Sequence, residues 1–453
     1  MAAKLIDKRL HNVPGKMQVT EWLFDVPVDY TKLPKDGGGM MRLFARSVSR
    51  LDSPVEQQPK EESKAPIPWL LYLQGGPGFG CGPPQNYSWV EPVLSKGYHI
   101  MFMDQRGTGL SQTITAGTLA RQGNAIQQAE YLKLFRADNI VNDCEVIRQY
   151  LTKDYPEGQR KWSIMGQSFG GFCATTYLCK YPESLKEAFI CAGLPPMVND
   201  PDPVYARTYE KVLERNKAYY TKYPEDVERV KTIMKYLTAN EIALPSGRLT
   251  PARFQQLGLL FGFHGGIDNV HDVVLRACND LEMFDSFTQP TLSIIDSNGG
   301  MDNNIIYAIM HEAIYCQERS SRWSADRKIK QDVRFKTDGS QPEIYFTGEM
   351  VFPNMLDSYS ELNKVREAAE ILAQTEDWPA LYNEETLANN EVPVYAATYI
   401  DDMYVHYDLA SQTAAKIKGI KQFITNTMYH DALRSKSGEV MRQLFALRDD
   451  TID

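Results

Sequence analysis

A single serine stands between two glycines in the stretch KWSIMGQSFGG, residues 161–171. Ser168 is the centre of a G-x-S-x-G pattern that follows a short apolar run and precedes residues with helical spacing. A strand, a sharp turn and a helix would expose its hydroxyl at the carboxyl edge of a sheet, as a nucleophile requires. Because glycine and serine are common residues, the pattern gains meaning only from partners elsewhere in the chain.

The partner that a serine hydroxyl needs first is a base to take its proton. Seven histidines limit the search. His430 is the candidate base, because it lies in a loop expected after the last strand and fits the chain order Ser…Asp…His. The other histidines lie in the N-terminal arm, in a strand-like run, in the middle of the chain or just after the candidate acids: His11, His99, His264, His271, His311 and His406.

The base in turn needs a carboxylate that orients it. The apolar run VPVYAATYI ends at Asp401 and Asp402, which would deliver both acids to the sheet edge where Ser168 and His430 are expected. Spacing alone does not separate the two neighbours, so either one can be the orienting acid.

Two N–H donors are expected to stabilise the oxyanion that forms when a serine attacks a carbonyl group. The residue after the nucleophile, Phe169, is placed to supply one of them. The run LLYLQ is followed by Gly75-Gly76-Pro77-Gly78, which lets backbone amides approach a substrate without side-chain obstruction, and this loop is expected to supply the other.

The elements that position these residues are short apolar runs separated by stretches with helical spacing. Runs that alternate with helices are typical of an α/β protein whose mostly parallel sheet is covered by helices on both faces. The expected strands lie in TEWLFDVPVDY, MMRLFARSVSR, PWLLYLQGG, GYHIMFMDQRG, KWSIMGQS, LKEAFICAGL, EVPVYAATYI and IKQFITNT.

The length of 453 residues predicts two or three domains. Residues 201–385 are rich in helical periodicity and contain few buried strand-like runs. We therefore expect a sheet core in residues 1–195, an inserted mainly helical domain in residues 196–385, and the final strands with the acid and the base in residues 386–453.

Composition narrows the functional class. Hydrophobic residues at 43% and charged residues at 24% are typical of a globular protein, and the net charge of −9 argues against nucleic-acid binding. No apolar run approaches the roughly 20 residues of a membrane span, and the N-terminus lacks the apolar segment of a secretory signal. The seven cysteines are scattered without metal-ligand spacing, which favours free thiols, a cytoplasmic location and no metal or other cofactor.

Three motifs together resemble the proline iminopeptidases, serine peptidases of the α/β-hydrolase fold that carry a helical cap. They are QGGPGFG at 74–80, DQRGTGLS at 104–111 and GQSFGG at 166–171, and the resemblance continues in the DDMYV and YHDA stretches. The family usually has a histidine before Gly-Gly-Pro-Gly, where this chain has Gln74. This departure could alter the loop without removing its amides.

The resemblance implies a role for each matched residue. Ser168 is the expected nucleophile and His430 the expected base. The family's acid–Met pair matches Asp402-Met403, which favours Asp402 over Asp401 as the orienting acid. Members of the family remove an N-terminal proline, so the implied substrates are peptides with a free N-terminal proline.

The resemblance also implies an oxyanion hole and acids that bind the substrate's imino group. Gly76 and Phe169 are the expected oxyanion donors. The stretch MHEAIYC points to Glu312 as the principal substrate-binding acid, and Glu349 is a second candidate. A zinc-binding HExxH pattern is excluded here, because Tyr315 stands where the second histidine would be.

Two other functions compete with a prolyl exopeptidase. A lipase or esterase would use the same triad with an apolar cap pocket, and an inactive hydrolase would act as a binding protein. The presence of Ser168, an acid, His430 and both oxyanion segments argues against the inactive protein. Epoxide hydrolases and dehalogenases are disfavoured, because their nucleophile is an aspartate. No pattern in the sequence specifies an oligomeric state.

Overall fold

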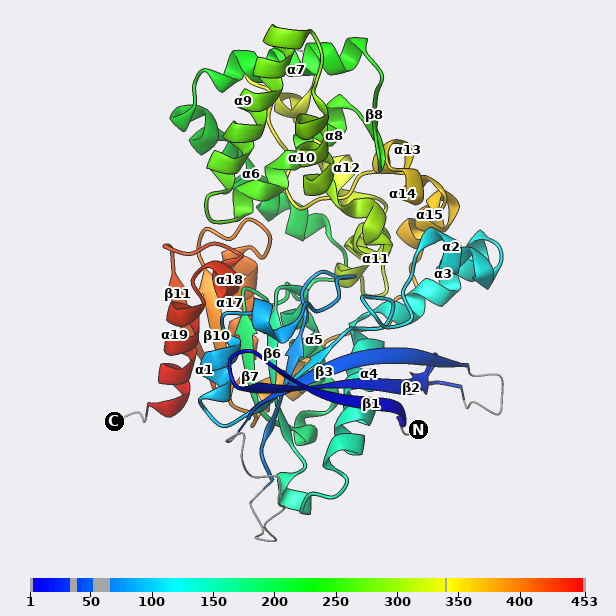
Figure 1. Cartoon of the computed structure of the whole chain (residues 1–453), viewed down its shortest axis with the longest axis vertical. Helices are drawn as coiled ribbons and strands as arrows, with labels where there is room; N and C mark the ends of the chain where they lie inside the picture. The colour runs from blue at the N-terminus through cyan, green and yellow to red at the C-terminus, as the bar shows by residue number, and fades with distance from the viewer. Residues whose placement is uncertain (1–2, 33–38, 52–65, 339, 451–453) are drawn as a thin grey trace.

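The structure is a computed structural model that describes residues 3–32, 39–51, 66–338 and 340–450. A twisted sheet forms the lower half of the molecule in Figure 1. Within these residues nine strands join in the order β1-β2-β3-β5-β4-β6-β7-β10-β11. Strands from β5 to β11 in this order are parallel, and β1, β2 and β3 are antiparallel to their neighbours. The strands are β1 (Lys4–Val13), β2 (Met17–Pro27), β3 (Met40–Arg50), β4 (Trp69–Leu73), β5 (His99–Met103), β6 (Trp162–Gln167), β7 (Leu185–Cys191), β10 (Val394–Tyr399) and β11 (Ile420–Thr425).

Helices cover both faces of the sheet because its central strands are apolar on both faces. In β4, Leu71 and Leu73 pack in one apolar cluster with residues of α4 and α5, whereas Leu70 and Tyr72 pack in another with residues of α1 and α19. Alternate residues of a strand point to opposite faces, which produces the two clusters. The helices of this half are α1 (Val90–Leu94), α2 (Ala116–Leu119), α3 (Ala125–Leu132), α4 (Ala137–Thr152), α5 (Phe169–Lys180), α16 (Glu384–Ala388), α17 (Tyr407–Lys416), α18 (Ala432–Ser435) and α19 (Ser437–Asp449).

A mainly helical region lies above the sheet in Figure 1 and is called the cap region here, residues 202–374. It leaves the core after β7 and returns before β10, and these two strands are neighbours in the sheet. The expected helical insertion is therefore present. It contains α6 (Asp202–Lys222), α7 (Asp226–Ala239), the hairpin β8 (Ile242–Leu244) and β9 (Gly247–Leu249), α8 (Pro251–Gln255), α9 (Gly266–Phe284), α10 (Gln289–Gly299), α11 (Ile305–Met310), α12 (Ser324–Ile329), α13 (Met355–Ser358), α14 (Ser360–Asn363) and α15 (Arg366–Gln374).

The sequence runs predicted the parallel strands, but the N-terminal arm proves to be a strand as well. β1 pairs with β2 at the sheet edge, and most of its side chains are exposed. An edge strand with few buried residues lacks the apolar run that identifies a central strand. Among the described residues, no helix is long and apolar enough to cross a membrane.

A buried ion pair ties the DQRGTGLS segment to the core. The Arg106 guanidinium donates to both carboxylate oxygens of Asp143 in α4, at 2.7 and 2.6 Å, and both side chains are fully buried. It also donates to the carbonyl oxygens of Pro27, Val28 and Leu134. The charge of Arg106 is thus matched by acceptors from three separate parts of the chain, which it holds together.

Replacing Arg106 by methionine is expected to lower the free energy of unfolding by about 3–5 kcal/mol, because it leaves the Asp143 carboxylate buried without its cation. Urea denaturation followed by circular dichroism measures this. The matched control is Arg121→Met, since Arg121 is exposed, and its effect should stay within about 0.5 kcal/mol. Equal stability of the two variants would show that the buried pair does not stabilise the fold.

Candidate active site

Ser168 occupies a sharp turn between β6 and α5. Its backbone has φ 55° and ψ −126°, a conformation that non-glycine residues rarely adopt. The flanking glycines are required by close packing. A Cβ added to Gly166 or Gly170 would lie 2.2 Å from the Gly170 carbonyl oxygen or 1.9 Å from that of Leu73. The turn places the Ser168 hydroxyl at the carboxyl edge of the parallel strands, where the G-x-S-x-G pattern predicted it.

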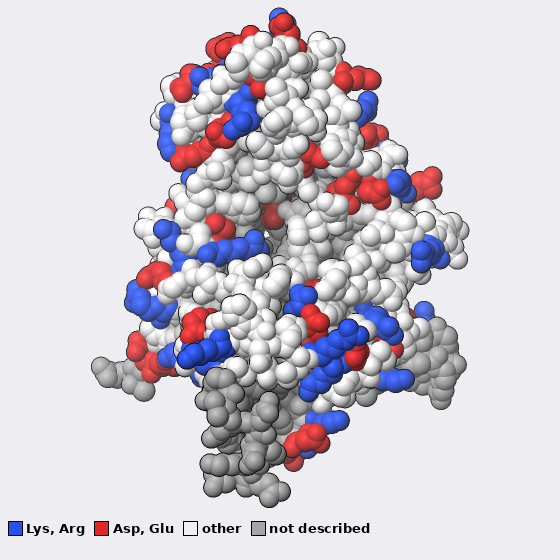
Figure 2. All heavy atoms as spheres, viewed as in Figure 1, with Lys and Arg blue, Asp and Glu red and all other residues white. Residues whose placement is uncertain are grey.

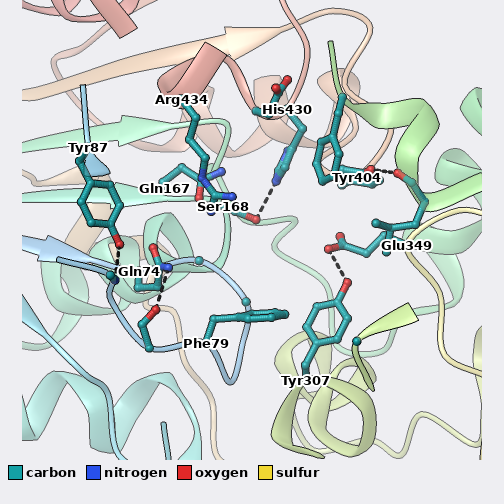
Figure 3. Close-up of a pocket in the computed structure, with 18 of the residues that line it drawn as sticks. Gln74, Phe79, Tyr87, Gln167, Ser168, Tyr307, Glu349, Tyr404, His430 and Arg434 are labelled. Carbon is teal, nitrogen blue, oxygen red and sulfur yellow. Dashed lines mark hydrogen bonds between the residues drawn. The ribbon is translucent and has the colours of Figure 1, made fainter. Parts of the chain in front are cut away.

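The structure brings the predicted base and acid to this hydroxyl. His430 Nε2 lies 2.8 Å from Ser168 Oγ (Figure 3), and His430 Nδ1 lies 2.8 Å from Asp402 Oδ2. His430 follows β11, and Asp402 follows β10. With the carboxylate as acceptor, Nδ1 carries the proton and Nε2 is left to accept the Ser168 hydroxyl. This chain of hydrogen bonds can draw a proton away from the serine.

Burial and hydrogen bonds hold the Asp402 carboxylate in place. Its side chain is 1% exposed, and its other oxygen, Oδ1, accepts from the N–H groups of Tyr404 and Val405 at 2.8 and 3.0 Å. Asp401 is different, because its side chain is 40% exposed and pairs with Lys211 of α6 at 3.5 Å. Of the two neighbours, the structure turns Asp402 toward the histidine.

The electrostatic environment favours a basic imidazole. Burial lowers the pKa of His430, but the carboxylate of Asp402, and to a smaller extent that of Glu349, more than offset this, so the pKa lies above the usual 6.5. Asp402 therefore also stabilises the imidazolium that forms when His430 takes a proton.

The loop of residues 74–80, called the glycine loop here, lies against the serine. A Cβ added to Gly75 would be 3.1 Å from Ser168 Cβ, and both Gly75 and Gly76 line the cavity in front of the serine. Phe169 is the first residue of α5, and the first N–H groups of a helix have no acceptor within the helix. The N–H groups of Gly76 and Phe169 thus belong to the two segments that flank Ser168.

Gln74, the residue directly before Gly75-Gly76-Pro77-Gly78, braces the glycine loop. Its Oε1 accepts from the Tyr72 hydroxyl at 2.9 Å, and its Nε2 donates to the Gly80 carbonyl at 3.2 Å (Figure 3). Gln105 of the DQRGTGLS segment donates to the Gln74 carbonyl at 3.1 Å. Glutamine thus connects both ends of the loop by hydrogen bonds.

Asp104 supports the same region from the other side. One carboxylate oxygen accepts from the Cys81 N–H at 2.6 Å and the other from the Leu110 N–H at 2.7 Å. The DQRGTGLS segment therefore binds both ends of the glycine loop region, through Gln105 at Gln74 and through Asp104 at Cys81. Its Arg106 is anchored in the core by Asp143.

A cavity of about 570 Å³ opens in front of Ser168 and His430, between the sheet edge and the cap region. Figure 2 shows the molecule hollowed between these two parts. The core lines the cavity with the glycine loop, the Ser168 turn and the segment after His430. The cap region contributes Leu259, Phe263, Asn298, Met301, Tyr307 and Glu349.

Glu349 presents the carboxylate of the cap region to this cavity. It lies on the opposite side of Ser168 from the glycine-loop residue Gln74 (Figure 3), and its Oε1 accepts from the Tyr307 hydroxyl at 2.9 Å. Burial, and next the Glu349 carboxylate, raises the pKa of Tyr307, so the phenol stays a hydrogen-bond donor. Glu349 is only half-buried, which leaves its carboxylate accessible to a bound cation.

Glu312 does not reach the cavity that Ser168 lines. Its carboxylate accepts from the N–H groups of Ser324 and Ala325 at 3.0 and 2.9 Å, at the start of α12. Burial raises its pKa to about 7, although these hydrogen bonds act in the opposite direction. The sequence pointed to Glu312 as the principal acid that binds the substrate's imino group. The structure instead directs the Glu312 carboxylate to backbone amides within the cap region. The weaker candidate, Glu349, is the one that lines the cavity.

Among the described residues, one group could bring metal-ligating atoms together: Glu225, Asp226 and His271 have such atoms within 4.8 Å of one another. None of the three lines the cavity at Ser168. Asp226 is already engaged by Arg229 and by the Tyr219 hydroxyl. Residues of this cap-region group therefore have no part in the chemistry at Ser168.

Residues 68–246 match the family described as the alpha/beta hydrolase fold. The chain is 51% identical to a proline iminopeptidase from Aspergillus aculeatus, over 100% of this chain and 98% of that protein. It is 35% identical to a proline iminopeptidase from Aeromonas sobria, over 97% and 99% of the two chains.

Among solved structures, a proline iminopeptidase from Mycobacterium smegmatis is 12% identical, with a TM-score of 0.41 over 94% of this chain and 98% of that one. The assignment rests on the two sequence relatives, whose similarity extends over nearly their full length. This chain belongs to the proline iminopeptidase family of α/β hydrolases.

Proposed function

We propose that this protein is a serine exopeptidase that releases N-terminal proline from peptides through an acyl-enzyme intermediate. The observation that carries the proposal is a hydrogen-bonded Ser168–His430–Asp402 chain facing a cavity whose cap-region side holds the carboxylate of Glu349. The names of the two relatives, both called proline iminopeptidase, support the same activity.

In the proposed mechanism, Ser168 Oγ attacks the carbonyl carbon of the N-terminal proline while His430 Nε2 takes the hydroxyl proton. The carbonyl oxygen becomes negative and accepts from the N–H groups of Gly76 and Phe169. His430 then gives its proton to the leaving amine, the C–N bond breaks, and a prolyl ester forms on Ser168. A water molecule, deprotonated by His430, attacks the carbonyl carbon of this ester. The bond between Ser168 Oγ and the carbonyl carbon breaks, His430 returns the proton to Oγ, and proline is released.

Selectivity for a free N-terminus is proposed to come from Glu349. The secondary ammonium of an N-terminal proline loses hydration on entering the cavity, and a carboxylate can replace it with a charge-assisted hydrogen bond. Glu349 lines the cavity, whereas Glu312 is occupied by backbone amides. We therefore propose that Glu349, rather than Glu312, is the principal residue that binds the substrate's ammonium group.

The pyrrolidine ring is proposed to lie among aromatic side chains near Glu349. Phe79 of the glycine loop and Tyr307 of the cap region form an edge-to-face pair with ring centroids 5.0 Å apart, and both line the cavity. Tyr404, also in the lining, packs edge-to-face on His430 at 4.7 Å. A compact apolar ring is suited to such a pocket.

A cytoplasmic location is proposed as well. All seven cysteines are free thiols, as is usual for proteins in a reducing compartment.

The Asp402→Asn variant is expected to lose about 10⁴-fold in kcat, because only Asp402 holds the reactive tautomer of His430 and stabilises its protonated form. Steady-state hydrolysis of a prolyl arylamide measures this. Asp401→Asn is the matched control, and since it removes only an exposed ion pair, it should change kcat less than about threefold. A larger loss in the Asp401 variant would show that Asp401, and not Asp402, orients His430.

The acidic limb of the pH profile of kcat/KM is expected to have its midpoint above pH 6.5. His430 must be neutral to act as a base, and Asp402 raises its pKa, so activity falls as the pH drops through this raised value. Prolyl arylamide hydrolysis between about pH 5 and 9 measures the limb. A midpoint well below 6.5 would contradict the proposed pairing of His430 with Asp402.

The Glu349→Gln variant is expected to lose about 10- to 100-fold in kcat/KM for a prolyl arylamide, because a charge-assisted hydrogen bond of about 1.5–3 kcal/mol is removed. Glu312→Gln is the matched control and should lose much less. Both variants should still react at Ser168 with a fluorophosphonate, which carries no amine.

The same assay separates the exopeptidase from an esterase. The unmodified enzyme should not cleave N-acetylprolyl arylamide, because acetylation removes the positive charge that Glu349 is proposed to bind. Equal cleavage of the free and acetylated substrates, together with rapid hydrolysis of a short acyl ester, would replace the exopeptidase by an esterase. A larger loss of kcat/KM in the Glu312 variant than in the Glu349 variant would show that Glu312 is the principal residue that binds the substrate's ammonium.

A further inference from the structure

The cavity at Ser168 also contains a cationic side chain that the proposed chemistry does not use. Arg434 belongs to the short helix α18, directly after the segment that carries His430, and it lines the same cavity as Ser168 and Glu349. In Figure 3 its guanidinium group points toward Gln167 and Ser168, and Glu349 lies on the other side of the serine. Glu349 and Arg434 therefore line the cavity on different sides of the nucleophile, and the other carboxylate in the lining, Asp431, is held by His264.

Within the described part of the chain, the Arg434 side chain has no ion pair. The nearest acid along the chain, Asp431, is occupied by His264 of the cap region, whose Nδ1 lies 2.6 Å from its Oδ1 and whose N–H donates to the same oxygen. Arginines further along the C-terminal segment are paired with acids, Arg442 with Glu439 and Arg448 with Asp449. Arg434 is thus available to a ligand.

The charge of Arg434 acts on groups around the cavity. Burial raises the pKa of Tyr87 to about 12, and Arg434 opposes that rise. Arg434 likewise opposes the raised pKa of His430. Tyr87 itself is held by a hydrogen bond from the Gly82 N–H at 2.9 Å, and it lines the cavity on the side of Arg434.

The direction of a bound peptide follows from these positions. If the prolyl ammonium lies at Glu349 and the scissile carbonyl at Ser168, the leaving peptide extends away from Glu349, toward the side where Tyr87 and Arg434 line the cavity (Figure 3). One extended residue spans at most about 3.6 Å, so the end of a short peptide stays within the cavity.

We propose that Arg434 binds the C-terminal carboxylate of the leaving peptide, which makes di- and tripeptides with a free carboxyl terminus the preferred substrates. This inference rests on the proposed prolyl exopeptidase function and adds a specificity-determining residue to it. The guanidinium fork matches a carboxylate with two parallel hydrogen bonds. In a protein with a net charge of −9, a local cation is also needed to offset the repulsion of an anionic group.

The test compares prolyl-glycine with prolyl-glycinamide, which differ only in the terminal carboxylate. The quantity measured is the ratio of their kcat/KM values in the unmodified enzyme, in Arg434→Gln and in Arg434→Lys. We expect the ratio to favour the free acid and to fall about two- to fivefold in Arg434→Gln, because Arg434 is exposed and an exposed ion pair contributes up to about 1 kcal/mol. Arg434→Lys should keep part of the preference. Effects of Arg434 on His430 change both substrates alike and cancel in the ratio.

The matched control is Lys436→Gln, which removes the same charge from an exposed residue outside the cavity lining. Its ratio should equal that of the unmodified enzyme. Raising the salt concentration should reduce the acid preference of the unmodified enzyme toward that of Arg434→Gln, because an exposed ion pair is screened.

An unmodified enzyme that cleaves both dipeptides equally would overturn the inference, as would an equal fall in the Lys436 and Arg434 variants. Failure of the proposed function has a different signature. If prolyl arylamide is cleaved but the acid preference is absent, only the role of Arg434 is wrong. If neither prolyl arylamide nor the dipeptides are cleaved, both the proposed exopeptidase function and the proposed carboxylate site at Arg434 are wrong.

Discussion

The unusual backbone of Ser168 is the constraint on which the rest of the site depends. A non-glycine residue with positive φ costs about 1–3 kcal/mol and persists only where the surroundings hold it. Here the Ser168 N–H donates to the Cys191 carbonyl of β7 at 3.0 Å, and the Ser168 carbonyl accepts from the Gly171 N–H at 2.7 Å. The parallel sheet and the start of α5 thus fix the turn from both sides, and every other functional group is positioned relative to it.

The glycine loop has no regular structure of its own, so its position is determined by neighbouring polar groups. Gln74 and Asp104 bind backbone groups at its end, and Arg106 ties the supporting segment to Asp143 in the core. Buried charges of this kind are expensive unless fully paired, but once paired they specify one arrangement. The preorganised donors that an oxyanion requires can therefore come from a loop.

Both the cap region and the core contribute charged residues to the cavity. Glu349 comes from the cap region and Arg434 from the core, and the two line the same space on either side of Ser168. Contact between His264 and Asp431 joins the cap region to the segment that carries His430. A substrate with an ammonium at one end and a carboxylate at the other would be oriented by these charges before any covalent step.

Local sequence patterns determined the parallel strands, the serine turn and the order of nucleophile, acid and base, because a buried strand and a sharp turn each leave a signal in adjacent residues. β1 was missed, since an exposed edge strand carries no apolar run. The choice between Glu312 and Glu349, and the position of Arg434 in the cavity, were decided only by the tertiary structure. Side chains far apart in the sequence meet through the packing of the cap region on the core, and no local pattern encodes the direction in which each one points.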